Sequence, residues 1–448
     1  MVTFMYKISS VRIYGLWGEK TLNFKFDDDV NILIGINGTG KTTVINILYS
    51  ILNAKSEIIS KCNFDKITIH LEDEGNPFST KVIYAARFGK NEDGYDKEVY
   101  YDIDGEGYLL VPDESKRLIY NRTKDVSPAK ASIVSEEQLN KIIKEIINVV
   151  GISTNRSKIG DENSNDDAFF SDFLKSSVVS SKNIDTILEE QIENLKSYQI
   201  EKNNKIKEMS IKYQKDILVE TLIEVDAKFN RRDLKYKSEN FVIKDKSNEL
   251  IQAYKNLGVI ENYNENKYRK KINDNLQTVN NVLKNLKDRE FKGIMIQDVV
   301  VLSLYEKLNQ VVDLSERFKI ETENELSSLR DFTKIINDDF YINKSVEINY
   351  SGDLKIYLED KKEINVKDLS SGEKQILTIL IESLLQRGMP NIFIADEPEI
   401  SLHISWQSKI ISSIKKLNKK AQVIIATHSP EVAGSYLSKI IDMKEAAE

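Results

Sequence analysis

Short apolar runs near the two ends of the chain predict β-strands, whereas the middle third carries a helical pattern. Residues 5–34 contain apolar positions with polar neighbours, partly in strict alternation, which indicates strands. Val30–Ile34 is a nearly continuous apolar run and predicts a buried strand. After residue 41 the apolar positions fall at spacings of three and four, which predicts an amphipathic helix.

Strand patterns recur on both sides of the middle third. A hairpin is predicted at 345–350 and 354–358, around a Ser-Gly-Asp turn. Two further apolar runs, 391–395 and 422–426, each end in polar residues. Three early segments separated by turn residues predict an antiparallel β-region: 66–71, 81–87 and 98–103. The chain therefore predicts an α/β fold whose core is split between its first third and its C-terminal part.

The middle of the chain has two kinds of pattern. Residues 152–182 are rich in Ser, Asn and Asp, which is typical of an exposed loop or a disordered segment. Apolar stripes with helical spacing follow at 183–213 and 246–290. Two antiparallel arms, each about 60 Å long at 1.5 Å per residue, would explain both stripes, and so would an ordinary helical subdomain without a protruding arm. We therefore expect three parts: an N-terminal head segment, a helical or coiled-coil insert and a C-terminal head segment, at 1–150, 151–335 and 336–448.

The loop between the first buried strand and the first helix, Gly35–Thr42, has the sequence G-x-x-x-x-G-K-[ST]. Strand, glycine-rich loop and helix in this order are the context of a phosphate-binding loop. Its glycines permit backbone conformations closed to other residues, so successive N–H groups can point at phosphate oxygens. The start of the helix adds its positive dipole end. We expect Lys41 to reach the β- and γ-phosphates and the Thr42 hydroxyl to hold Mg²⁺.

Two acidic residues follow the apolar run at 391–395. Asp396 stands at the carboxyl end of that strand, where it can hold Mg²⁺. Glu397 points the other way and can orient or deprotonate the water that attacks the γ-phosphate. His428 follows the run at 422–426 and can hydrogen-bond the γ-phosphate and this water, although a strand-end histidine can also be structural. We assign His403 and His70 structural roles.

The segment Ser370-Ser-Gly-Glu373 begins a predicted helix, with Ser370 as its cap. The start of this helix is a second anion site. One chain cannot easily place both this helix and the Lys41 loop on the same nucleotide.

Composition narrows the class of protein. Hydrophobic residues make up 40% of the 448 residues, enough for a sizeable core, and the net charge of −7 argues against a generic nucleic-acid-binding protein. Cys62 is the only cysteine, so no intramolecular disulfide can form, which fits a reducing, cytoplasmic compartment. With three histidines, a zinc site is not expected. No apolar run is long enough to span a membrane.

Four of these motifs resemble those of a known class of ATPases. Gly35–Thr42, Leu369–Gln375, Asp396–Pro398 and Thr427-His428 resemble the Walker A, signature, Walker B and switch-histidine motifs of ABC-class ATPases. The split core with a helical insert is similar to the SMC, Rad50 and RecF group. The stretch Asp396–Gln407 is closer still to ATPases of anti-phage defence, including the ATPase subunit of PARIS and, next, the Septu ATPase.

The resemblance implies an ABC-type P-loop head that hydrolyses ATP with Mg²⁺ at a composite site between two subunits. Glu397 and His428 would be catalytic, and Thr42 and Asp396 would hold the metal. The signature residues of one subunit would complete the site of another, so at least a homodimer of heads is implied. The nucleotide-binding set is Gly35, Asn37, Gly38, Thr39, Gly40, Lys41, Thr42, Thr43, Ser370, Ser371 and Gly372.

The sequence departs from the family at two points. No Gln occurs before Gln138, so the Q-loop glutamine is not assigned. The chain stops at Glu448, soon after the switch histidine, where the overcoming-lysogenization-defect nucleases carry a Toprim domain. We therefore expect an ATP-hydrolysing sensor or scaffold that controls a separate nuclease, of Toprim or HNH type. The alternative is a RecF- or SMC-like ATPase of DNA repair or DNA clamping.

Two basic islands lie in the insert, at 231–237 and 267–271. Most such runs are solvated helix faces. The alternative is a positive surface for an acidic ligand, either a phage protein that mimics DNA or DNA itself.

Overall fold

The computed structural model describes residues 6–73, 75–90, 96–110, 131–153, 184–222, 241–260, 264–290 and 295–447. The chain divides into two compact units. The first combines Met1–Lys196 with Leu329–Glu448, and the second is Ser197–Ser328. No helix in the described ranges is both long and apolar enough to cross a membrane.

A five-stranded parallel sheet forms the centre of the first unit. Its strands lie in the order β15-β3-β14-β13-β9. The register sets Thr427 of β14 opposite Ile34 of β3, and Ala426 opposite Asp396 of β13. Because all four pairings are parallel, the polar residues after β3, β13 and β14 begin at the same edge of the sheet. The strand bounds are β3 Val30–Ile34, β9 Val149–Ser153, β13 Asn391–Asp396, β14 Ala421–Thr427 and β15 Ile440–Asp442.

A seven-stranded sheet carries the antiparallel β-region that the sequence predicts. Its order is β2-β1-β4-β5-β6-β7-β8, and only the β7–β8 pair is parallel. Val11 of β1 faces Phe24 of β2 and Ile69 of β4, and all three are buried. The bounds are β1 Tyr6–Leu16, β2 Lys20–Lys25, β4 Lys66–Asp73, β5 Asn76–Lys90, β6 Asp96–Ile103, β7 Glu106–Leu110 and β8 Ser132–Val134.

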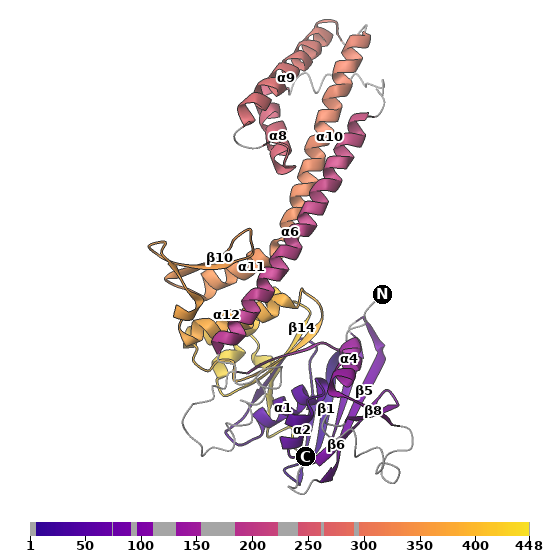
Figure 1. Ribbon diagram of the computed structural model, residues 1–448, viewed down its shortest axis with the longest axis vertical. Coiled ribbons are helices and arrows are strands. Elements are labelled where there is room, and N and C mark those ends of the chain that lie inside the picture. The colour runs from indigo at the N-terminus through magenta and orange to yellow at the C-terminus, as the bar shows by residue number, and fades with distance from the viewer. Residues whose placement is uncertain are drawn as a thin grey trace. The chain divides into compact units, whose positions relative to one another are not determined.

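Helix α1, Lys41–Leu52, packs against both sheets (Figure 1). It is apolar over most of its surface, and Val44, Ile47 and Leu48 are fully buried. From the seven-stranded sheet the Tyr101 hydroxyl donates to the carbonyl of Ile51 at 3.2 Å. Helix α1 is therefore held by packing on two sides. Helices α2 (Ser56–Lys61) and α4 (Glu136–Ile146) complete this layer.

The C-terminal part of the first unit adds helices and a small sheet. The predicted hairpin is confirmed as β10 and β11, which pair antiparallel with Val346 opposite Ile356. The bounds are α11 Ser327–Ile335, the π-helical turn η2 Ile336–Phe340, β10 Lys344–Ile348, β11 Leu354–Leu358, β12 Glu363–Ile364, the turn η3 Val366–Asp368, α12 Ser371–Leu385, α13 Ile404–Gln407, α14 Ile410–Leu417, and the turns η4 Pro430–Ala433 and η5 Leu437–Lys439.

In the second unit, the part of α6 (Ile184–Leu222) that follows Lys196 pairs antiparallel with α10 (Ile296–Glu325) (Figure 1). The Tyr213 ring meets the Phe318 ring edge to face at 5.4 Å, and its hydroxyl donates to Glu321 at 2.9 Å. The 183–213 stripe therefore packs on α10 and, near its C-terminal end, also on the segment 246–290, because Tyr213 clusters with Leu257 and the Gln214 side chain donates to the Leu257 carbonyl at 3.0 Å. The second arm expected at 246–290 is not one continuous helix. Residues 246–290 lie mainly in α8 (Ile243–Asn256) and α9 (Glu265–Asp288), which pack on each other and on α10.

Candidate active site

The phosphate-loop sequence takes up the backbone that its glycines predict. Gly38 and Gly40 have φ of 79° and 93°, in the region that favours glycine. Gly40 is the N-cap of α1, and its carbonyl accepts from the Val44 amide at 2.9 Å. The Thr39 hydroxyl donates to the Ile36 carbonyl at 2.9 Å, which closes the loop on itself. Asn37 and Gly38 are exposed on this loop, and Thr43 is half-buried in the first turn of α1.

Lys41 lies inside the loop. Its Nζ donates to the carbonyl of Gly35 at 2.7 Å and stands 3.3 Å from Nδ1 of His428. Burial lowers the pKa of Lys41, while the carboxylates of Glu397 and Asp396 oppose this shift. The ammonium group therefore sits where loop carbonyls, the histidine and acidic side chains converge.

The side chains of Thr42 and Asp396 meet at the carboxyl edge of the five-stranded sheet. The Thr42 hydroxyl donates to Oδ1 of Asp396 at 3.3 Å. Asp396 is buried, and this burial raises its pKa to about 7, with Glu397 and Glu399 adding to the shift. A buried carboxylate among other carboxylates is unfavourable without a cation.

These two oxygen groups fit Mg²⁺, which prefers few protein ligands together with water and phosphate oxygens. Across the described residues, no cluster of three or more His, Cys, Asp or Glu side chains assembles that could hold a metal alone. A hydroxyl and a carboxylate beside a phosphate loop agree with the shared coordination that Mg²⁺ uses in P-loop sites.

Glu397 and His428 form the second pair. Oε1 of Glu397 lies 3.1 Å from Nε2 of His428. Glu397 has a positive φ of 46°, which is rare for a non-glycine residue, and its amide donates to the Ala426 carbonyl at 2.8 Å. Strained backbone of this kind is concentrated at functional sites. The turn after β13 thus directs Asp396 toward Thr42 and Glu397 toward His428.

Glu399 is a site residue that the sequence interpretation missed. Its Oε1 accepts from the Thr427 hydroxyl and from the His428 amide, the latter at 3.2 Å. The residue is 8% exposed, and Oε2 is buried without a hydrogen-bond partner among the described residues. Burial raises the pKa of Glu399, and its two hydrogen bonds oppose the rise. The only signal for Glu399 in the sequence was the density of acids in Asp-Glu-Pro-Glu.

The signature segment has the predicted cap. The Ser370 side chain accepts from the Glu373 amide at 3.3 Å, and Glu373 accepts from the Ser370 amide at 2.7 Å. A Cβ on Gly372 would lie 2.7 Å from the carbonyl oxygen of Ser401, so only glycine fits there. Outside the helix, Glu373 also pairs with Lys344 of β10 at 2.5 Å, and its carbonyl accepts from the Tyr341 hydroxyl at 3.2 Å. Ser371, the first residue of α12, follows the cap.

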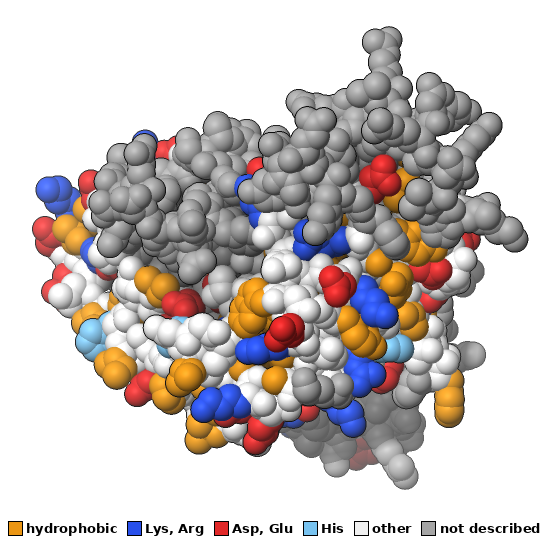
Figure 2. Space-filling view, turned by 90° about the horizontal axis from the view of Figure 1, so that it is seen from below, with side chains coloured by type: hydrophobic (Ala, Val, Ile, Leu, Met, Phe, Trp, Pro, Cys, Tyr) orange, Lys and Arg blue, Asp and Glu red, His pale blue; other side chains and the backbone are white. Residues whose placement is uncertain are grey.

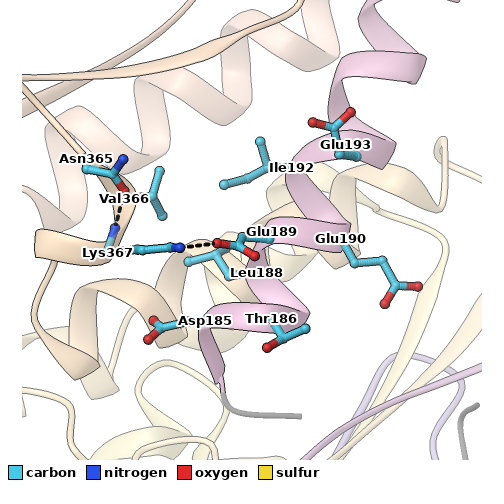
Figure 3. A pocket seen from close by; sticks show the side chains of 10 residues that line it. All are labelled: Asp185, Thr186, Leu188, Glu189, Glu190, Ile192, Glu193, Asn365, Val366 and Lys367. Atoms are coloured by element: carbon cyan, nitrogen blue, oxygen red, sulfur yellow. Dashed lines mark hydrogen bonds and ion pairs between the residues drawn. The ribbon is translucent and has the colours of Figure 1, made fainter. Parts of the chain in front are cut away.

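A cavity of about 720 Å³ lies between the first turns of α6 and the residues Asn365, Val366 and Lys367 (Figure 3). Its wall carries Asp185, Glu189, Glu190 and Glu193 from the first turns of α6. Its one lysine, Lys367, is already paired with Glu189 at 2.8 Å. The surplus of carboxylates would repel a triphosphate, so this cavity does not compete with the loop as a nucleotide site.

The structure also shows where the other residues discussed from the sequence lie. Gln138 belongs to the capping box of α4, with its side chain on the Ser135 amide at 3.0 Å. His403 caps α13 through the Ser405 amide at 3.3 Å, and His70 is exposed on β4. Lys267, Lys270 and Lys271 are exposed on α9, whereas residues 231–237 lie outside the described residues.

Comparison with known proteins identifies the family to which the chain belongs. The chain belongs to the AAA ATPase domain family, whose pattern matches residues 6–433, and it is an ATPase. It is 38% identical over 80 residues to the "Retron Ec83 probable ATPase" of Escherichia coli, a match that covers 15% of this chain and 15% of that protein's length.

Two solved structures are similar in fold. One is the Smc head domain of Pyrococcus furiosus with an extended coiled coil bound to the C-terminal domain of ScpA, at 15% identity and a TM-score of 0.44, covering 98% of this chain and 93% of that chain. The other is the SMC head domain of Thermotoga maritima, at 10% identity and a TM-score of 0.37, covering 95% and 91%.

Proposed function

We propose that this ATPase is the sensor or scaffold subunit of an anti-phage defence system and controls a separate nuclease. ATP hydrolysis is supported by one observation: five predicted site residues lie together at one edge of the sheet. They are Lys41, Thr42, Asp396, Glu397 and His428. The local identity to a retron-associated ATPase supports the defence part. The resemblance of Asp396–Gln407 to the PARIS and Septu ATPases supports a separate effector, of Toprim or HNH type.

In this mechanism the loop binds the phosphates of ATP, and Lys41 exchanges the Gly35 carbonyl for phosphate oxygens. Thr42 and Asp396 would hold Mg²⁺, which neutralises charge on the β- and γ-phosphates. Glu397 accepts a proton from the attacking water, and His428 holds Glu397 in place through the 3.1 Å contact. Positioning and charge stabilisation supply most of the rate enhancement in phosphoryl transfer.

The site would be completed by a second copy. Ser371 and Gly372 begin α12, whose N-terminal end is an anion site. A second subunit could present this helix end to the γ-phosphate, so that ATP joins two heads and hydrolysis releases them. Nucleotide-dependent dimerisation is then the conformational signal that controls the nuclease.

The test is co-expression with the neighbouring gene, followed by native mass spectrometry and phage plating. We expect a stable complex with a nuclease, and loss of protection in Lys41→Ala and Glu397→Gln. If the wild-type pair forms no complex and gives no protection against a broad phage panel, the defence role is refuted, while ATP hydrolysis stands separately.

A DNA-clamping ATPase is the second candidate, and the exposed lysines on α9 favour it. The net charge of −7 argues against a DNA-binding role. On the described part of the face shown in Figure 2, acidic, basic and hydrophobic side chains are interspersed, without a continuous basic stripe. Lys270→Glu with Lys271→Glu should remove salt-dependent stimulation by double-stranded DNA or triggering by a phage protein, and leave basal hydrolysis unchanged. A normal response would make these lysines solvated surface.

A further inference from the structure

Gln375 joins the signature helix to the turn that carries Glu397. It belongs to α12, is 6% exposed, and its Nε2 donates to the carbonyl of Pro398 at 2.5 Å. Pro398 is buried and stands between Glu397 and Glu399 in the sequence. Proline has no backbone N–H, so its carbonyl is the polar backbone group by which this part of the turn can be held. The Gln375 amide therefore anchors the turn between the two acids.

The backbone of this turn is strained at two positions. Glu397 has a φ of 46° and Ser401 has a φ of 69°, a region in which non-glycine residues are rare. Conformations of this kind persist only where the surrounding structure imposes them. The Glu397 amide donates to the Ala426 carbonyl at 2.8 Å, and the next residue is held by Gln375. The direction of the Glu397 side chain therefore depends on bonds on both sides of its Cα.

The helix end that carries Gln375 is itself fixed. The Tyr341 hydroxyl donates to the Glu373 carbonyl at 3.2 Å. A Cβ placed on Gly372 would lie 2.7 Å from the carbonyl oxygen of Ser401, so α12 and the turn are in close contact here as well. The Gln375 side chain therefore extends from a backbone that cannot shift freely, and it can hold a strained turn in place.

Filling of the core does not explain a glutamine at this position. The neighbouring residues Ile376, Leu377 and Ile379 of α12 are all buried and apolar. Burying a side-chain amide costs free energy unless the amide is hydrogen-bonded. A methionine would fill the same volume without this cost, so the bond to Pro398 is the property that distinguishes Gln375 from an apolar residue.

We propose that Gln375 is a positioning residue for ATP hydrolysis and that it aims Glu397 of its own subunit at the attacking water, through the Pro398 carbonyl. This inference rests on the proposed role of Glu397 as the base. Gln375 then differs from Ser371 and Gly372, which would act on ATP bound to the second copy. The signature segment thus serves two sites: its start completes the site of the partner, and its end sets the base of its own subunit.

Gln375→Met keeps the size of the side chain and removes the donor. We expect kcat for ATP hydrolysis to fall about 10-fold to 100-fold, since a displacement of about 1 Å at a reacting group can cost about 100-fold. The Kd of the slowly hydrolysed analogue ATPγS with Mg²⁺ should stay within about twofold of wild type, because the lost bond is to the turn and not to the phosphate loop. An unchanged kcat, or a loss of affinity as large as the loss in kcat, would overturn the proposal.

Thr378 offers a matched control in the same helix. It is 8% exposed, and its hydroxyl donates to the Lys374 carbonyl at 2.9 Å. Thr378→Val should lower the midpoint of thermal unfolding and leave kcat within about twofold of wild type. If it slows hydrolysis as much as Gln375→Met, the loss of any buried bond in α12 explains the effect, and Gln375 is not a positioning residue. If Gln375→Met fails to fold by circular dichroism, Gln375→Asn, whose amide is one methylene short of Pro398, replaces it with the same expected and contrary results.

Mixed subunits show on which site Gln375 acts. When Ser371→Arg is combined with Lys41→Ala, the complete site has its phosphate loop and its Glu397 in the Ser371→Arg subunit. Gln375→Met added to that subunit should slow hydrolysis about 10-fold to 100-fold, and added to the Lys41→Ala subunit it should leave hydrolysis within about twofold. The reverse pattern would mean that Gln375 acts on the ATP of the partner, and equal losses would mean general damage to α12. Either result overturns the proposal.

The proposed active site is checked separately. If the mixture without Gln375→Met recovers no hydrolysis in proven heterodimers, the shared site fails, while kcat and Kd of Gln375→Met still decide the role of Gln375. If Glu397→Gln turns over within about twofold of wild type, Glu397 is not the base and both ideas fall. If Glu397→Gln is slow, adding Gln375→Met should slow it no further. A further loss of about tenfold would mean that Gln375 does not act through Glu397, and it would overturn the proposal alone.

Discussion

Replacing Glu399 with Ala tests whether a buried carboxylate positions His428. Its Oε1 accepts from the Thr427 hydroxyl and from the His428 amide. Thr427 is fully buried, so its hydroxyl would lose its carboxylate acceptor where water cannot replace it. A buried unsatisfied polar group costs about 1–3 kcal/mol, so we expect unfolding free energy to fall by that order. The His428 amide loses its carboxylate acceptor as well.

The effect on catalysis should be larger than the effect on stability. Without Glu399, the His428 backbone is free to move, and His428 is the contact that orients Glu397 at 3.1 Å. A displacement of about 1 Å at a reacting group can cost about 100-fold. We therefore expect kcat for ATP hydrolysis to fall about 10-fold to 100-fold and KM to change little, since Glu399 touches neither the phosphate loop nor Lys41 through a hydrogen bond.

A double-mutant cycle is the assay that separates positioning from general damage. Glu399→Ala, His428→Ala and the double mutant are compared in kcat at saturating ATP, with Glu399→Gln as the variant that keeps an acceptor. If Glu399 acts through His428, the double mutant should be no worse than His428→Ala. Additive losses, or a Glu399→Gln enzyme as impaired as Glu399→Ala, would refute the reasoning.

Three further predictions concern catalysis, the shared site and the fold. Glu397→Gln should bind ATP normally and hydrolyse it about 10²–10⁴-fold more slowly; turnover within twofold of wild type would remove Glu397 as the base. Ser371→Arg should bind ATP without head pairing, and mixing it with Lys41→Ala should restore some hydrolysis; no recovery in proven heterodimers argues for a site within one chain. Gln422→Leu should lower unfolding free energy in urea by about 3 kcal/mol, because buried Gln422 bonds Ile8 N, Ile8 O and Asp27 O at 2.7–2.8 Å; a loss below about 1 kcal/mol would contradict this.

Much of the candidate site could be predicted because its signals are local. The glycines of the phosphate loop need a strand before them and a helix after them, and both are encoded within 23 residues, Val30–Leu52. Asp396 is the last residue of a strand that is buried on both faces, and Glu397 follows it, so the apolar run before them is unbroken. The parallel register then brings these local motifs together at one edge without further information.

The rest depended on contacts that local patterns do not encode. The stripe on α6 shows which face is buried but not that α10 covers it, because imperfect heptads fit several partners. Strand β9 is five residues long and has no flanking motif, and only its pairing with β13 makes it part of the sheet. Glu399 owes its place in the site to Thr427, a neighbour 28 residues away, across turns whose geometry the sequence leaves open.

The order of strands explains why the two ends of the chain must fold together. Strand β3, which carries the phosphate loop, lies between β14 and β15, and β9 lies against β13. Each N-terminal strand of this sheet therefore pairs only with C-terminal strands that follow more than 200 residues later. A segment ending near residue 150 would expose both edges of β3 and the apolar residues of α1 that pack on β13 and β14. The phosphate loop thus acquires its rigid base only when the C-terminal strands, which bring Asp396 and His428, join the same sheet.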